Sequence, residues 1–157
     1  MISKINIGEF RERLDKNIKY GNPRIKGTPF GAFYIFSESN KTFFGTYDKT
    51  KFELTKNFIT QITPFIISGQ IQSIDNNKTE VNYEIKPIGF GYYWMKYFLV
   101  LAIPVFNLIL YSQSAPLEIF KIANLVLFAM AIFNYFYIRR KKNKLEKDFK
   151  KIFEVET

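Results

Sequence analysis

The 157-residue chain contains no histidine and no cysteine. Their absence excludes serine–histidine and cysteine–histidine nucleophile pairs, thiolate zinc sites and the side chain that most often acts as a general base near pH 7. The carboxylates of Glu9, Glu12 and Asp15 lie among basic residues, which is typical of a solvated helix face. No phosphate-binding loop is indicated by the spacing of Gly45, Gly69, Gly89 and Gly91. We therefore predict a protein that is not an enzyme, with no catalytic residue, cofactor, metal or evident small-molecule substrate.

Charged residues are also missing from two long segments, residues 97–117 and 122–138. An α-helix rises about 1.5 Å per residue, so about 20 residues cross the hydrocarbon core of a bilayer, which is about 30 Å thick. With their flanking aromatic residues both segments reach that length. They predict a transmembrane helical hairpin over residues 88–138, with helices at about 90–112 and 117–138. The alternative, a buried hairpin in a soluble protein, would need a larger core than the remaining, mostly polar residues can provide.

The orientation of the hairpin follows from the distribution of cations. Four consecutive cations begin at Arg139, directly after the second segment, whereas the connecting turn has no Lys or Arg before Lys121. By the positive-inside rule, we expect a multi-pass protein of the inner membrane with both termini in the cytoplasm. The expected membrane-interface anchors are Trp94, Lys96, Tyr135, Tyr137, Arg139, Arg140, Lys141 and Lys142.

Two asparagines interrupt the apolar segments. Asn107 and Asn124 lie seven and ten residues from Ser114 in the turn, so their depths differ by only about 4 to 5 Å. A polar side chain in hydrocarbon requires a partner, and we expect an interhelix contact between Asn107 and Asn124 that contributes about 1 kcal/mol. In a second interpretation, one of them lines a polar path or contacts a partner subunit.

Residues 1–87 predict a cytoplasmic α+β domain. Phe10, Leu14 and Ile18 recur at four-residue spacing between charges, which indicates a short amphipathic helix that stops at Gly21. Strands are expected to follow it.

The first strand is expected at residues 31–37, followed by two short strands about a turn at Asp48 and Lys49. The clearest hairpin spans residues 64–86, where apolar and polar residues alternate after a turn rich in Asp and Asn. These patterns predict about five strands and one helix, in an antiparallel sheet with one solvated face.

Residues 139–157 predict a basic amphipathic helix that continues the second transmembrane helix. Its apolar stripe consists of Leu145, Phe149, Ile152 and Phe153. The stripe either lies on the anionic inner leaflet or covers the sheet of the N-terminal domain. We favour the second, because a small one-sided sheet must bury its apolar face.

The order of several motifs is familiar. Four features follow one another along the chain. They are a helix containing Arg13, Leu14, Asn17 and Ile18, the FFG motif at residues 43–45, a second strand at residues 52–54, and a hairpin that leads into membrane helices. The chain in this respect resembles a group of small uncharacterised two-span membrane proteins of Bacteroidota with an N-terminal FFG-hairpin domain. The resemblance covers about residues 1–110 and implies an opening strand, a helix, the FFG hairpin and a transmembrane pair. It implies no activity.

These observations predict a non-enzymatic accessory or scaffolding subunit of a larger membrane protein complex, which acts through its cytoplasmic domain and its hairpin. The expected partners are membrane lipid and a protein partner or a second copy of the chain. One alternative is an immunity protein that neutralises a membrane-acting toxin. Another is a module that senses anionic lipid, as the net charge of +9 suggests. Nucleic-acid binding is not expected, because aromatic residues and cations are segregated along the chain.

Overall fold

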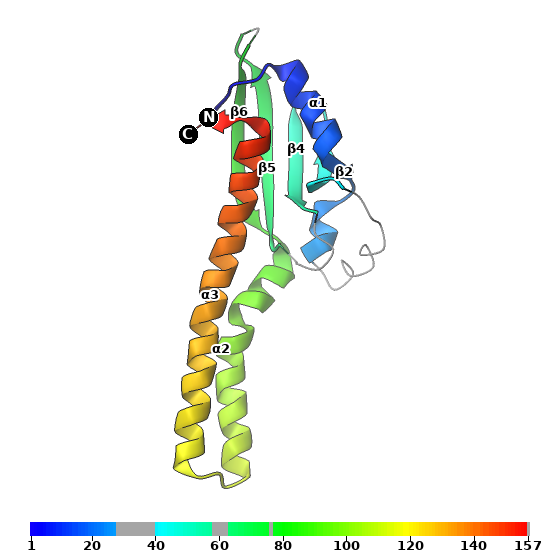
Figure 1. The fold of residues 1–157 in the computed structure, drawn as a ribbon. Helices are drawn as coiled ribbons and strands as arrows, with labels where there is room; N and C mark the ends of the chain where they lie inside the picture. Colours follow the sequence, from blue (N-terminus) through cyan, green and yellow to red (C-terminus); the bar gives the residue numbers. More distant parts are fainter. Residues whose placement is uncertain (28–39, 58–62, 76, 157) are drawn as a thin grey trace.

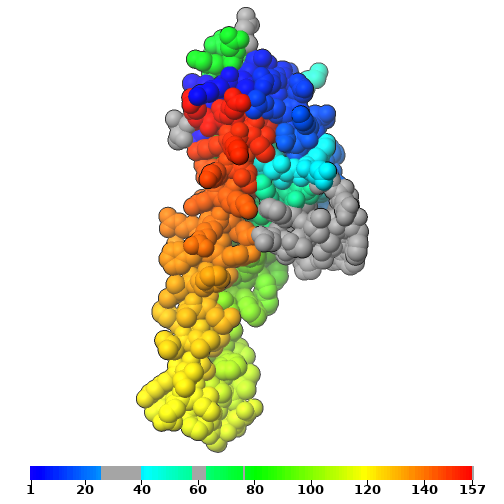
Figure 2. Space-filling view, in the orientation of Figure 1, coloured from blue at the N-terminus to red at the C-terminus, as the bar shows by residue number. Residues whose placement is uncertain are grey.

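A broad sheet body and a narrow stalk of two helices make up the molecule (Figures 1 and 2). The structure is a computed structural model, which describes residues 1–27, 40–57, 63–75 and 77–156. The sheet is mostly antiparallel and precedes two long apolar helices, so the predicted α+β class is confirmed.

One seven-stranded sheet forms the body, with strand order β2-β3-β4-β5-β6-β1-β7. Five of the six neighbouring strand pairs are antiparallel, and the sixth, β2 with β3, is parallel. The strands are β1 (Ile2–Ser3), β2 (Ile18–Tyr20), β3 (Phe43–Tyr47), β4 (Lys51–Lys56), β5 (Phe65–Ser73), β6 (Thr79–Pro87) and β7 (Val155–Glu156).

Three α-helices and one short 3₁₀ helix complete the described fold. They are α1 (Ile7–Asn17), η1 (Pro23–Gly27), α2 (Gly89–Ser112) and α3 (Leu117–Phe153). The side chain of Asn6 begins α1 by accepting a hydrogen bond from the backbone N–H of Glu9 at 2.9 Å. Helix α3 is continuous over 37 residues and runs from the tip of the stalk to the far end of the sheet body (Figure 1).

Helix α1 and the C-terminal part of α3 cover the same face of the sheet. The ring of Phe149 stacks on Phe52 of β4 at 5.4 Å and meets Tyr83 of β6 edge-on at 5.1 Å. Phe153 stacks on Phe10 of α1 with ring centroids 4.7 Å apart. The apolar stripe of the C-terminal helix therefore packs on the sheet instead of lying on a lipid surface, as the favoured interpretation expected.

The two predicted strand hairpins are confirmed. Strands β3 and β4 enclose the turn at Asp48 and Lys49, and Phe52 and Leu54 are both buried on the helix-covered face. Strands β5 and β6 pair over nine residues. Along β6 the side chains alternate between the core and solvent, as a sheet with one solvated face requires.

The FFG motif is explained by packing on both faces of β3. Phe43 lies in the core beneath the helices, and Phe44 is buried on the opposite face against Gly21. A Cβ atom at Gly45 would lie 1.9 Å from the backbone oxygen of Glu53 on β4. The glycine therefore permits the close approach of two strands, and the motif serves the fold.

Several predictions about the N-terminal domain were wrong. Helix α1 ends at Asn17, four residues before Gly21, and Ile18 begins β2 with its side chain buried against the core. The sheet is not entirely antiparallel, because β2 pairs with β3 in parallel. Strands β1, β2 and β7 have only two or three residues each, too few to produce a periodic signal. The predicted strand at residues 31–37 lies outside the described residues.

Both ends of the chain meet at one edge of the sheet. Strand β1 pairs with β7, and the hydroxyl of Ser3 donates a hydrogen bond to the carbonyl of Phe153 at 2.5 Å. Arg13 of α1 donates to the carbonyl of Ile152 at 2.7 Å and to the carboxylate of Glu154 at 2.8 Å. The termini are therefore held together, at the end of the body farthest from the turn of the stalk (Figure 1).

We expect Phe149→Ala to lower the free energy of unfolding of the sheet body by about 3–5 kcal/mol, because the substitution leaves a cavity between α3 and the sheet. Chemical denaturation of the full chain in detergent, followed by circular dichroism, measures this loss. Lys147→Ala, at an exposed position of the same helix, should change stability by no more than about 0.5 kcal/mol. Equal stabilities of the two variants would contradict the packing described above.

Candidate interaction surfaces

The structure places Asn107 of α2 opposite Asn124 of α3. Each amide N–H donates to the side-chain oxygen of the other at 2.8 Å. The second N–H of each amide donates to a backbone carbonyl one turn back in its own helix. For Asn107 this is the carbonyl of Ile103, at 2.8 Å, and for Asn124 it is the carbonyl of Phe120, at 2.9 Å. Both N–H hydrogens of each amide are thus used within the hairpin, which favours a structural role over a polar path.

A third asparagine contact lies nearer the sheet body. The side chain of Asn134 on α3 donates to the backbone oxygen of Met95 on α2 at 2.6 Å. This contact was not predicted, although an asparagine within an apolar segment is a signal of the same kind as Asn107 and Asn124. The two levels of contact fix the antiparallel register of the hairpin over most of its length.

The Asn134 contact also brings the predicted interface anchors of the two helices to a similar level. Trp94, next to Met95 in sequence, and Tyr135, next to Asn134, are both exposed, and the Nζ atom of Lys96 lies 5.0 Å from the ring centroid of Tyr97. On α3, Lys141 lies over the ring of Tyr137 at 4.9 Å. The remaining anchors, Arg139, Arg140 and Lys142, are exposed on the next turn of α3.

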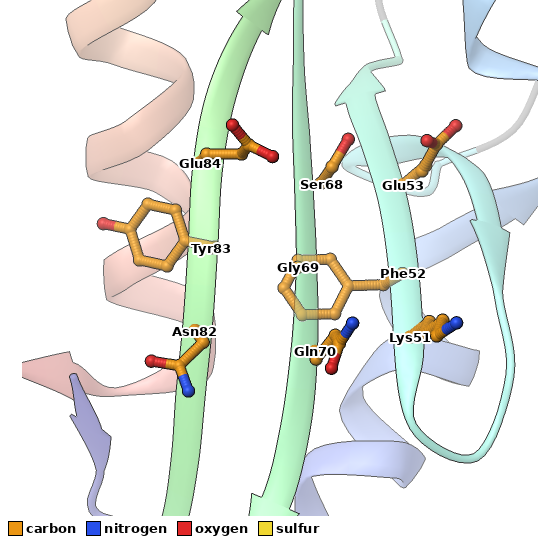
Figure 3. A pocket seen from close by; sticks show the side chains of 9 residues that line it. All are labelled: Lys51, Phe52, Glu53, Ser68, Gly69, Gln70, Asn82, Tyr83 and Glu84. Atoms are coloured by element: carbon orange, nitrogen blue, oxygen red, sulfur yellow. The ribbon is translucent and has the colours of Figure 1, made fainter.

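The face of the sheet opposite the helices carries the solvated surface of the body. Two rows of polar side chains cross strands β4, β5 and β6 there (Figure 3). We call these six residues the polar face: Lys51, Gln70 and Asn82 in one row, and Glu53, Ser68 and Glu84 in the other. Between the rows, Phe52 extends toward the core over Gly69, where a Cβ atom would lie 2.5 Å from the ring.

The polar face is a shallow surface, with a depression of about 430 Å³. The carboxylate of Glu53 pairs with Arg24 at 3.1 Å, and that of Glu84 pairs with Lys86 at 2.5 Å. Within the described part of the chain, no three acidic or other metal-ligating side chains gather into a possible metal site. The polar face is therefore an open surface that carries charges of both signs.

Two tyrosines connect the sheet to the helices that cover it. The hydroxyl of Tyr47 donates to the carboxylate of Asp15 on α1 at 2.7 Å, and burial together with this bond raises the pKa of Tyr47 to about 12. Tyr83 donates to Glu146 on α3 at 3.1 Å, and burial raises the pKa of its phenol above the ordinary value. Both phenols are therefore neutral at physiological pH and act as structural hydrogen-bond donors.

The chain matches no protein-family model, and no curated protein or solved structure matches it. The resemblance to two-span membrane proteins of Bacteroidota therefore stays a prediction from the sequence.

We expect Asn107→Ala and Asn124→Ala each to destabilise the hairpin by about 0.6–1.7 kcal/mol, and the double variant to lose about as much as either single one. The reason is that each amide loses its partner when the other is removed. Thermal unfolding of the full chain in detergent, followed by helical circular dichroism, measures the cycle. Ser112→Ala serves as the control, because its hydroxyl donates within α2 alone, to Ile109. Additive losses for Asn107 and Asn124 would contradict the reciprocal contact.

Proposed function

We propose that this protein is a non-enzymatic accessory or scaffolding subunit of a larger protein complex in the inner membrane, where α2 and α3 anchor it. The observation that carries this proposal is the unusual surface of the stalk. Both helices are long and apolar enough to cross a membrane. Among the residues of α2, all of which the structure describes, none is buried.

The exposed apolar surface of the stalk supports insertion into a bilayer. Leu101, Leu108, Leu125, Phe128 and Phe133 are each more than half exposed. An apolar helix in the core of a soluble protein would be buried by the rest of its own chain, and in this chain the sheet body lies beyond the end of the stalk (Figure 2). Lipid or the helices of another subunit would cover this surface.

The polar face supports a contact with a second protein outside the bilayer. It is broad, open and formed by three hydrogen-bonded strands, so its side chains are held in fixed rows. Its mixed charges and amides match the polar surfaces through which many non-obligate complexes form. The helix-covered face is filled by the core of the protein, whereas the polar face of the described strands is open.

The pairing of β1 with β7 supports the proposed orientation. If the hairpin crosses the membrane, both termini lie on one side of it, because they belong to one sheet. The cations at residues 139–142 lie where α3 enters the body, and the positive-inside rule assigns that side to the cytoplasm.

Affinity purification of the full chain from membranes in mild detergent should recover a stoichiometric partner. Asn82→Arg, which adds bulk and charge to the polar face, should reduce the recovered partner by about tenfold, a loss of about 1.4 kcal/mol of binding free energy. Asn143→Arg makes the same change at an exposed position of α3 and should leave recovery unchanged. Recovery of the chain alone as a monomer in several detergents would contradict the subunit role.

Orientation is tested independently with a phosphatase that is active only outside the cytoplasm. A fusion after Thr157 should be inactive, whereas an insertion at Ser114, in the turn of the stalk, should be active. The reverse pattern would show that the sheet body lies outside the cytoplasm, and activity at neither site would contradict a membrane-spanning hairpin.

A further inference from the structure

A cavity of about 340 Å³ lies where the sheet body meets the first turn of α2. Its walls come from three elements that are far apart in the sequence. They are formed by Arg24 of η1, Ile66 and Ser68 of β5, and the segment 86–90, which leads from β6 into α2. One side of this cavity is polar and the other is apolar.

The polar side carries two cations. Arg24 and Lys86 line it, and among its described lining residues none is a carboxylate. Outside the cavity, Arg24 pairs with Glu53 and Lys86 pairs with Glu84. The side chains of Arg24 and Lys86 are nevertheless 69% and 57% exposed. Ion pairs this exposed contribute little free energy, so an anion in the cavity competes with them readily. The hydroxyl of Ser68 adds a further hydrogen-bond donor.

The apolar side continues onto the stalk. Ile66 and Ile88 are buried at its base, and Phe90 projects from its edge with 69% of its surface exposed. Phe90 begins a ladder of three exposed rings at four-residue spacing along α2. The centroids of Phe90 and Trp94 are 5.9 Å apart, and those of Trp94 and Phe98 are 5.0 Å apart. An apolar surface therefore runs from the cavity along the outside of the helix.

The position of the cavity along α2 matches the headgroup layer of a bilayer. About 20 residues counted back from Ser112 reach Tyr93, which places the cytoplasmic edge of the hydrocarbon near that residue. Gly89 then lies about 6 Å above this edge, within the headgroup layer, which is about 5–7 Å thick on each side. Lipid phosphates occupy this level.

We propose that this cavity binds an acidic phospholipid. Its phosphate lies between Arg24 and Lys86, within reach of Ser68, and one acyl chain follows the ladder past Trp94 and Phe98. A zwitterionic lipid brings its own positively charged ammonium group to the same two cations, so the site prefers a headgroup with net negative charge. This inference depends on the proposed insertion of the stalk and goes beyond the subunit role, because it gives the body a specific lipid ligand.

The single tryptophan of the chain, Trp94, lies in the middle of the ladder and reports on its neighbours. We would reconstitute the full chain in phosphatidylcholine vesicles and compare quenching of Trp94 by phosphatidylglycerol and by phosphatidylcholine, each brominated on the acyl chains. One cation near a lipid surface favours an acidic lipid by about 1 kcal/mol, which is about fivefold, so the wild-type protein should prefer brominated phosphatidylglycerol by at least about fivefold.

The double variant Arg24→Gln with Lys86→Gln should reduce this preference to within about twofold of equal binding. Arg24→Lys with Lys86→Arg keeps both charges and should retain the preference. Lys147→Gln with Lys151→Gln removes the same charge from exposed positions of α3 and should behave as wild type. The cations at residues 139–142 are present in all of these proteins, so a difference between the double glutamine variant and the wild-type protein reports on Arg24 and Lys86.

Equal quenching by the two lipids in the wild-type protein overturns the acidic-lipid site while leaving membrane insertion intact. Quenching by neither lipid shows that Trp94 does not lie in the bilayer, which overturns the proposed insertion. A preference that millimolar inorganic phosphate abolishes assigns the cavity to a free anion instead of a lipid, and a preference that survives in the double glutamine variant places acidic lipid elsewhere.

Discussion

The packing of Phe149 and Phe153 on the sheet is the contact on which the rest of the structure depends. A sheet with one apolar face needs a cover, and α1 alone supplies only part of it. The other part comes from the last residues of the chain, at the end of the same helix that forms half of the stalk. Because α3 is continuous, the stalk and the body share one element, and the position of one constrains the position of the other.

The cover of the sheet is completed late in the folding of the chain. The apolar face formed by residues 1–87 remains without its full cover until residues 145–153 have been synthesised and the stalk between them has formed. Contacts this distant in sequence carry a larger loop-closure cost than local ones, and the hairpin reduces that cost by returning the chain to the sheet. The stalk therefore serves the fold of the body as well as its attachment.

The strongest patterns in the sequence led to correct predictions. Long uncharged segments identified the two apolar helices, and alternation of apolar and polar residues identified the β3–β4 and β5–β6 hairpins, because length and period are local properties. Ile18 was misplaced because its four-residue spacing from Leu14 fits a helix, whereas burial against the sheet makes it the first residue of β2. The strands β1 and β7 had no local signal, since each consists of two residues that are held extended by strands distant in the sequence, β1 by β6 and β7, and β7 by β1. The cavity beside α2 had none either, because its walls come from η1, β5 and the start of α2.

The sequence by itself determined the class of the protein, which is an α+β body with two apolar helices and a basic segment after the second helix. Composition and period decide these features because they depend on neighbouring residues alone. Only the tertiary structure decided where the C-terminal stripe packs, that the termini pair, and that Arg24 and Lys86 line one cavity. These features join residues that are distant in sequence, and only the closure of the sheet, which buries apolar surface and satisfies backbone hydrogen bonds together, brings them into contact.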